Sequence, residues 1–147
     1  MDIDKTRWIT MMVNNETFLE PIEHVKEVIP YSKPTNVPSS PSWITGILNV
    51  RGEIIPVVSM REILDIGQTH DSPEQKVVMI ESSDGLFGVT VDGVDDIVEL
   101  DNTSIEFQPS ASATDLIKGT VPLDKTLGII LDLTHTIQAV AEADLDI

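Results

Sequence analysis

Apolar residues fall along the chain in short runs of Val, Ile and Leu that are bounded by Gly, Pro, Asn, Asp and Ser. Runs of this composition are typical of β-strands. The first covers residues 8–13 and ends at the turn-like pair Asn14-Asn15. The pattern therefore predicts a chain built mainly from strands, with Trp8 and Phe18 in strand positions that face a core.

Three pairs of runs are separated by turn residues, and each pair predicts a β-hairpin. The predicted tips are Arg51-Gly52, residues 82–85 and residues 124–126. Gly52 can adopt backbone angles that other residues avoid, which suits a tight tip. We therefore expect strands at residues 44–50 and 53–59, at 76–81 and 86–91, and at 116–123 and 127–133.

Helical patterns are few. Residues 22–27 are compatible with one or two turns, and residues 60–66 predict a short amphipathic turn that ends at Gly67. Residues 134–143 predict the longest helix because their apolar side chains share one side. Residues 30–42 hold four prolines and residues 67–75 are polar, so both predict loops. Trp43 would pack the first loop down, and the second would link two halves of the chain.

The two halves of the chain repeat the same order of apolar and glycine positions. Residues 18–28 align with residues 87–97 at an offset of 69, and residues 44–46 and 54–60 align with 117–119 and 127–133 at an offset of 73. The change of offset falls in a loop, where insertions are tolerated. Each half then holds about five strands, enough for a small barrel. The repeat predicts an all-β fold of two abutting barrels with a groove between them, which is a natural binding surface.

The chain is strongly acidic, with 25 acidic and 9 basic residues and a formal charge of −16. This charge repels phosphate backbones and anionic lipid heads, so we expect neither nucleic-acid binding nor direct membrane contact. It is compatible with simple solubility or with a basic protein partner. The acidic start lacks the pattern of a secretion signal, and no apolar run approaches the ~18 residues that cross a bilayer, which predicts a cytoplasmic location.

Residues suited to catalysis or metal binding are scarce. The chain has no cysteine, and His24, His70 and His135 lack the spacing of metal ligands, so we interpret them as surface residues. Neither a nucleophile elbow nor a phosphate-binding glycine loop is present, and carboxylate pairs such as Asp95-Asp96 follow from composition alone. We therefore expect no catalytic residue, no metal site, no cofactor and no enzymatic activity.

Arg51 is a lone cation at a predicted hairpin tip in an acidic chain. It is compatible with a simple exposed turn. It is equally compatible with a guanidinium that projects toward a carboxylate of a partner and binds it through two hydrogen bonds, a geometry that suits Arg better than Lys.

The run from Ile44 to Val58, Ile-Thr-Gly-Ile-Leu-Asn-Val-Arg-Gly-Glu-Ile-Ile-Pro-Val-Val, resembles the signature of the CheW family of chemotaxis coupling proteins. Residues 22–28, 87–98, 117–119 and 127–133 continue the resemblance, which covers roughly residues 7–140 in all. It implies a single CheW-like domain over residues 1–147, formed by two intertwined five-stranded SH3-like β-barrels and short helices, one of them at the C-terminus. The approximate lobes are residues 7–70 and 75–140, between which strands can be exchanged.

The resemblance also implies a function. Members of this family are non-enzymatic adaptors that couple the cytoplasmic tips of chemoreceptors to the regulatory domain of the histidine kinase CheA, and other CheW-like domains are possible further partners. The positions that match the family's receptor-binding residues are Ile22, Val25, Glu27, Gly46 and Arg51. The positions that match its kinase-binding loop are Pro34, Thr35, Asn36 and Val37.

Two places depart from the family pattern. Ser59 stands where the family usually has Asp, with Arg61 kept, and Leu19-Glu20-Pro21 replaces an early Gly-Ile-Asp. Pro21 fixes φ and removes a hydrogen-bond donor, so the first groove segment can start differently. These departures leave open a CheW-like scaffold of a pilus or other non-flagellar system. The charge of −16 leaves a second alternative, an acidic regulatory module that binds a basic protein electrostatically.

Overall fold

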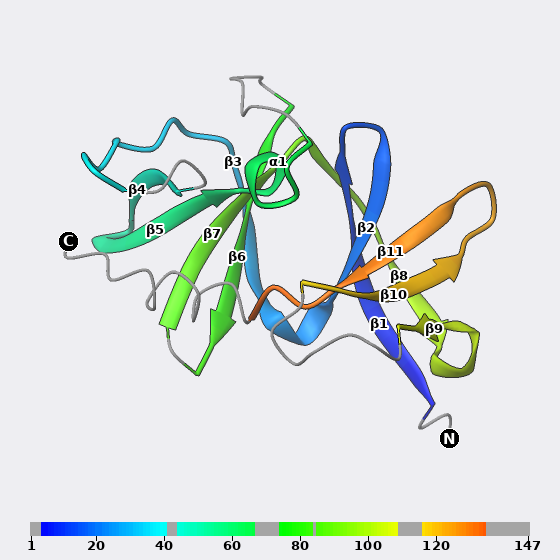
Figure 1. The fold of residues 1–147 in the computed structure, drawn as a ribbon. Coiled ribbons are helices and arrows are strands. Elements are labelled where there is room, and N and C mark those ends of the chain that lie inside the picture. Colours follow the sequence, from blue (N-terminus) through cyan, green and yellow to red (C-terminus); the bar gives the residue numbers. More distant parts are fainter. Residues whose placement is uncertain (1–3, 41–43, 67–73, 84, 109–115, 135–147) are drawn as a thin grey trace.

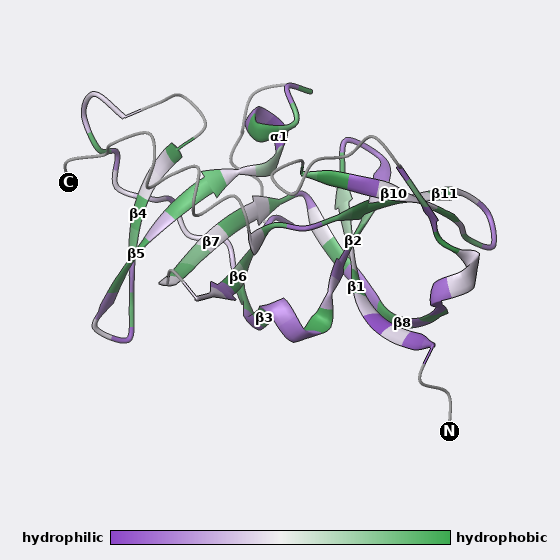
Figure 2. Cartoon of the chain, turned by 60° about the horizontal axis from the view of Figure 1, so that its bottom comes forward, coloured by the Kyte–Doolittle hydropathy of each residue, from purple (hydrophilic) through white to green (hydrophobic). Residues whose placement is uncertain are grey.

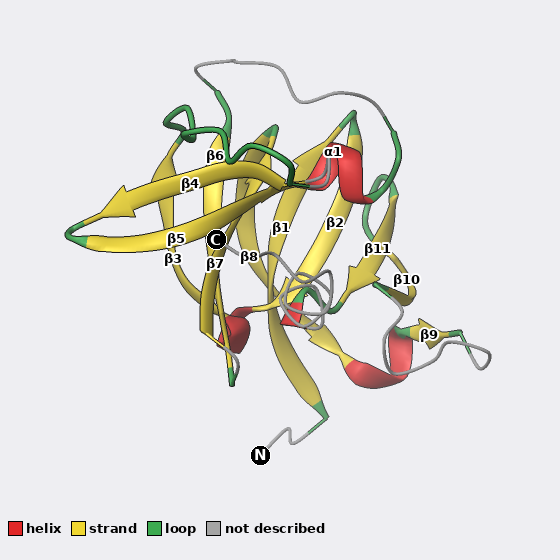
Figure 3. Ribbon diagram, turned by 60° about the vertical axis from the view of Figure 1, so that its left-hand side comes forward, coloured by secondary structure: helices red, strands yellow, loops and turns green. Residues whose placement is uncertain are grey.

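Strands make up most of the computed structural model, which describes residues 4–40, 44–66, 74–83, 85–108 and 116–134 (Figure 3). The strands are β1 (Lys5–Val13), β2 (Glu16–Pro21), β3 (Val25–Pro30), β4 (Ile44–Val50), β5 (Glu53–Ser59), β6 (Lys76–Ser82), β7 (Gly85–Val91), β8 (Gly93–Asp101), β9 (Glu106–Phe107), β10 (Ile117–Pro122) and β11 (Leu127–Leu131). The helices are η1 (Ile22–His24), α1 (Met60–Ile63) and η2 (Asn102–Ser104). None of the described helices is long and apolar enough to cross a membrane.

The strands form two sheets that lie side by side (Figure 1). The larger has the order β8-β1-β2-β11-β10-β9, and the smaller has the order β3-β6-β7-β5-β4. Two strand pairs, β2 with β11 and β5 with β7, are parallel, and the other pairs are antiparallel. The hairpin β1–β2 thus joins strands of the second half of the chain, and the hairpin β6–β7 joins strands of the first half. This all-β, two-sheet fold confirms the predicted class.

The sequence repeat is visible in the order of the strands. The alignment pairs β1, β2, β3, β4 and β5 with β6, β7, β8, β10 and β11. When each strand of the smaller sheet is replaced by its counterpart, its order becomes β8-β1-β2-β11-β10, which is the larger sheet without β9. The irregularities also correspond, because the register shifts between Ile44 and Gly46 and again between Ile117 and Gly119. The two sheets therefore have one architecture.

The short strand β9 departs from the expectation of five strands in each barrel. Its Glu106 and Phe107 pair with Thr120 and Gly119 of β10. The counterpart in the smaller sheet is a single bridge between Thr35 and Ile47 of β4. A short segment thus lies along the same edge of both sheets, and only one of them is long enough to count as a strand.

The described residues form three hydrophobic clusters, of which one joins the two sheets. The central one contains residues from both sheets, including Phe18, Val58 and Phe87. Each sheet also has an apolar cluster of its own, with Trp8 and Leu19 in the larger sheet and Val57 and Val77 in the smaller one. Successive strand residues point to opposite faces, so neighbouring pairs contribute to two clusters. This explains the unbroken apolar runs, which Figure 2 shows as green stretches along strands such as β5 and β7.

The predicted hairpins are confirmed, and the tightest turns have the expected backbone. Asn14 and Asn15 have φ of 54° and 66°, and Arg51 and Gly52 have φ of 50° and 87°. Two consecutive left-handed residues match the right-handed twist of the flanking strands. The hairpins β6–β7 and β10–β11 are also present.

The helical prediction for residues 22–27 is wrong beyond its first turn. Helix η1 ends at His24, and Val25 begins β3, which pairs with β6. The alternating burial of β3 shows that pairing with a distant strand overrides the local helical pattern. The predicted turn after Ser59 is confirmed as α1, whereas the predicted helix 134–143, Trp43 and most of the loop 67–75 lie outside the described residues.

Candidate functional site

Glu27 and Arg51, two of the predicted receptor-facing positions, form an ion pair with each other. Arg51 Nη2 contacts Glu27 Oε1, and Nη1 lies 3.4 Å from Oε2. The hydrogen bond and the charge of Glu27 raise the pKa of the Arg51 guanidinium. The Arg51 side chain is 68% exposed and that of Glu27 30%. Arg51 is therefore exposed at the hairpin tip, but it has an internal partner that the sequence did not reveal.

Ile22 and Val25, two further receptor-facing positions, lie in η1 and at the first residue of β3. Both are half-buried and pack against the central hydrophobic cluster. They occupy the junction between the two sheets, because β2, which precedes η1, belongs to the larger sheet and β3 to the smaller one. A ligand there would contact only the exposed parts of these side chains.

Gly46 is buried beneath the loop that holds the predicted kinase-facing positions. A Cβ atom at this position would lie 2.1 Å from the carbonyl oxygen of Thr35, and the φ of 149° also disfavours other residues. Thr35 N–H donates to Ile47 O and Ile47 N–H donates to Thr35 O, each at 2.9 Å. Gly46 thus allows the loop to lie directly on β4. It connects the two predicted binding surfaces physically, which the sequence did not suggest.

The loop between β3 and β4 forms one wall of a cavity of about 440 Å³. Pro34, Asn36 and Val37 line it, whereas Thr35 does not. Ile44 and Thr45 of β4 and Glu62 of α1 also line it. The structure thus brings three of the four predicted kinase-binding positions to one cavity, and none of the five predicted receptor-binding positions lines it. This cavity is at the edge of the smaller sheet, and the groove predicted between the two lobes stays a prediction.

Ser59, which departs from the family pattern, caps α1. Its hydroxyl accepts a hydrogen bond from Glu62 N–H at 3.4 Å. Arg61 pairs instead with Asp92, through Nε to Oδ1 at 2.9 Å and Nη2 to Oδ2 at 2.6 Å. Asp92 also accepts from Asn14 N–H at 2.8 Å. The carboxylate that holds Arg61 is therefore supplied by the turn between β7 and β8.

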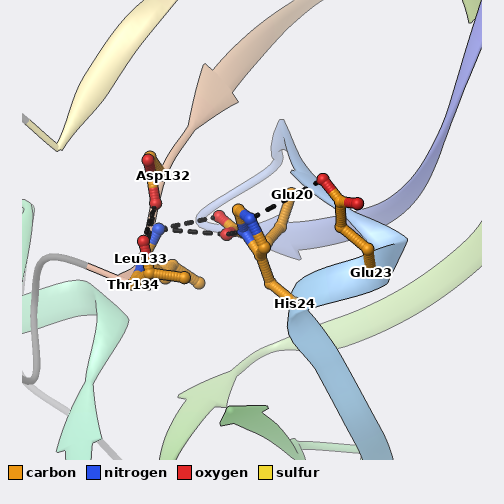
Figure 4. A network of polar contacts seen from close by, with 6 residues as sticks. All are labelled: Glu20, Glu23, His24, Asp132, Leu133 and Thr134. Carbon is orange, nitrogen blue, oxygen red and sulfur yellow. Dashed lines mark hydrogen bonds and ion pairs between the residues drawn. The ribbon is translucent and has the colours of Figure 1, made fainter. Parts of the chain in front are cut away.

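A buried polar network at the end of β2 was missed by the sequence analysis (Figure 4). Glu20 is fully buried, and its carboxylate accepts hydrogen bonds from Leu133 N–H at 3.0 and 3.1 Å. His24 Nδ1 lies 2.6 Å from Glu20 Oε2. Burial raises the pKa of Glu20 to about 7, and the hydrogen bond to Glu20 raises the pKa of His24. The interpretation of His24 as a surface histidine is therefore wrong. The available signal was Glu20 itself, at the place of an apolar residue in the family pattern.

Glu20, His24 and Asp132 place three potential metal-donor atoms within 4.8 Å of one another. The Glu20 oxygens are already engaged by Leu133 and His24, and Asp132 Oδ1 accepts from Thr134 N–H at 3.0 Å. These bonds join the end of β2 to the segment that follows β11. We therefore assign the group a structural role in fixing the turn η1, which carries Ile22.

Comparison with known proteins shows that most of this chain is similar to one family. The family model described as CheW-like domain matches residues 7–141. The chemotaxis protein CheW of Bacillus subtilis (strain 168) is 28% identical over 109 residues, which are 74% of this chain and 70% of that protein. The chemotaxis protein CheW of Thermotoga maritima is 28% identical over 140 residues, which are 90% of this chain and 87% of that protein.

A solved structure is also similar. The crystal structure of the scaffolding protein TtCheW from Thermoanaerobacter tengcongensis superposes with a TM-score of 0.78 at 28% sequence identity, over 86% of this chain and 88% of that one. The match of the family model across most of the sequence and the shared two-sheet fold lead to one conclusion: this chain belongs to the CheW family.

Proposed function

We propose that this chain is a non-enzymatic adaptor that couples the cytoplasmic tip of a chemoreceptor to the regulatory domain of the histidine kinase CheA. The observation that carries the proposal is that the smaller sheet has two candidate surfaces, and that neither Glu27 nor Arg51 lines the cavity. One contains the exposed Glu27–Arg51 pair, and the other contains the cavity beside Pro34 and Val37. A protein that joins two partners needs two surfaces that can be occupied together. Membership of the CheW family supports the same role.

The Glu27–Arg51 pair is the proposed receptor contact. An exposed guanidinium can break its ion pair with an internal carboxylate and bind a carboxylate of a partner instead. The loss of free energy of folding is small, because exposed ion pairs contribute little to stability. Glu27 would then be available to a cation on the receptor. The pair thus offers a partner both signs of charge at one hairpin tip.

Substitution of Arg51 tests this contact. Arg51→Glu should weaken binding of a purified receptor cytoplasmic fragment by about tenfold or more, because it replaces attraction by repulsion. The midpoint of thermal unfolding should hardly change. Isothermal titration calorimetry and differential scanning fluorimetry measure the two quantities.

Arg51→Lys and the exchange Glu27→Arg with Arg51→Glu are the matched controls. The lysine variant keeps the charge and should bind better than Arg51→Glu, whereas the exchange restores an internal pair of reversed polarity and should not restore affinity. If Arg51→Glu unfolds the protein while the exchange restores it, Arg51 is structural. If binding falls steeply with salt equally in all variants, the acidic-module alternative is favoured.

A further inference from the structure

Glu62 has an unusual position in the cavity beside the β3–β4 loop. It lies in α1 on the cavity wall, and its Oε2 is buried without a hydrogen-bond partner. Buried carboxylate oxygens normally accept a hydrogen bond. Burial without a donor removes the water around the oxygen and replaces it with no other hydrogen bond, which is unfavourable. Glu62 lines the open cavity, but Oε2 itself is closed off from it, so a donor from outside the chain can pair with this oxygen once the Glu62 side chain turns toward the cavity.

The rest of the cavity fits a donor at the end of an apolar stem. Pro34 and Val37 provide aliphatic surface, and Tyr31 provides an aromatic ring, whereas Ile44 is almost fully buried. Lys33 also lines the cavity, but it is exposed, so its ammonium can remain in water. Apolar walls with a carboxylate at one side are complementary to a long cationic side chain.

We propose that this cavity receives an arginine side chain of a partner protein, with the guanidinium on the Glu62 carboxylate and the methylene groups on the apolar wall. A change of side-chain rotamer at Glu62 would bring the whole carboxylate, with Oε2, to the guest. The planar guanidinium can bond both carboxylate oxygens, which an ammonium cannot do equally well. The formal charge of −16 adds a long-range attraction for a basic partner.

The inference rests on the proposed function in one respect. Three kinase-facing positions, Pro34, Asn36 and Val37, line the same cavity, so the arginine is assigned to the kinase's CheW-like regulatory domain. The cavity chemistry itself does not depend on that assignment. A small probe and the kinase domain therefore test the two claims separately.

The small-probe experiment titrates N-acetyl-argininamide into the ¹⁵N-labelled full chain and follows amide chemical shifts by NMR. The citrulline analogue, which has nearly the same shape without the charge, is the control ligand. We expect the arginine probe to shift the amides of Ile44, Thr45 and Glu62, and to bind at least tenfold more weakly to Glu62→Gln. Glu106→Gln, which removes an exposed carboxylate elsewhere, should leave the affinity unchanged. Equal shifts with citrulline, or equal losses in both variants, would overturn the proposal.

A gain-of-function variant excludes misfolding as the explanation. Lys33→Glu replaces a positive charge at the cavity, which repels the arginine probe, with a negative charge that attracts it. Binding of the probe should therefore become severalfold stronger. Unchanged or weaker binding would contradict the assignment of the cavity.

The kinase domain is then titrated against the same variants. We expect Glu62→Gln to weaken its binding by about tenfold and to leave binding of the receptor fragment unchanged. If the kinase domain binds wild type and Glu62→Gln equally, the arginine anchor is wrong while the proposed function stands. If the kinase domain does not bind at all, the proposed function fails, and the small-probe result alone decides the chemistry of the cavity.

Discussion

Glu20 shows how one residue can change the behaviour of a shared fold. Its carboxylate occupies a fully buried strand position, where the family pattern has an apolar residue, and its partners are His24 and Leu133 N–H. Burial raises the pKa of Glu20 to about 7, and the hydrogen bond to Glu20 raises that of His24. Both shifts make the folded chain bind more protons than the unfolded chain. Its free energy of unfolding should therefore fall as pH rises through these groups.

Glu20→Gln should remove this pH dependence. The contribution of Glu20 is lost between pH 4.5, the ordinary pKa of a glutamate, and about pH 7, and that of His24 is lost from pH 6.5 upward. The free energy of unfolding of Glu20→Gln minus that of wild type should therefore rise by about 1–3 kcal/mol from pH 5 to pH 8. Urea denaturation at several pH values measures the difference.

Glu16→Gln on the same strand is the control, because Glu16 is exposed and its removal should give no such trend. A flat difference between Glu20→Gln and wild type would mean that Glu20 and His24 do not share a proton in the folded state.

At the scale of the elements, the position of the β3–β4 loop depends on its close contact with strand β4. The loop carries the cavity, and its contact with β4 requires a glycine at position 46 because the Thr35 carbonyl lies directly above it. Gly119 has the same relation to Glu106 O, at 2.4 Å from an added Cβ, where β9 lies along β10. At both sheet edges, a glycine thus allows the neighbouring segment to lie directly on the strand.

Gly46→Ala should detach the loop from β4. The new Cβ would displace the Thr35 carbonyl and strain the backbone, at a cost of about 1–3 kcal/mol in the free energy of unfolding. We also expect faster hydrogen exchange of the Thr35 and Ile47 amides and a larger loss of kinase-domain binding than of receptor binding.

Gly93→Ala is the matched control, because a Cβ there meets no atom within 4 Å. If Gly46→Ala has no larger effect than Gly93→Ala on exchange or stability, the loop does not depend on Gly46.

At the scale of the whole molecule, the strand exchange joins the two halves into one folding unit. Strands β1 and β2 lie between β8 and β11 of the second half, and β6 and β7 lie between β3 and β5 of the first half. Neither half can complete a sheet alone, and the central hydrophobic cluster needs both.

Residues 1–66 and 67–147, produced separately, should therefore be largely unfolded by circular dichroism and NMR. An equimolar mixture should recover the spectrum of the intact chain with a single cooperative unfolding transition. Independent folding of either fragment would contradict the exchanged topology.

Much of this fold was predictable, because its signals are local or repeat at a fixed distance. The strand runs, the turn at Arg51-Gly52 and the offset of 69 between the halves are all visible in the sequence. The start of β3 could not be predicted, because its pairing with the distant strand β6 overrides a weak helical pattern. The Glu27–Arg51 pair, the Glu20 network and the cavity at Glu62 join residues that are distant in sequence or lie on different elements. Spacing alone therefore does not reveal them.

The central claim is that this chain bridges two partners, and a retention assay tests it most directly. A purified receptor cytoplasmic fragment is immobilised, and the regulatory domain of the kinase is passed over it with and without this chain. We predict that the kinase domain is retained only when the chain is present, and that Arg51→Glu abolishes most of the retention. Failure of the chain to bind either partner, or equal retention of the kinase domain without it, would contradict the account.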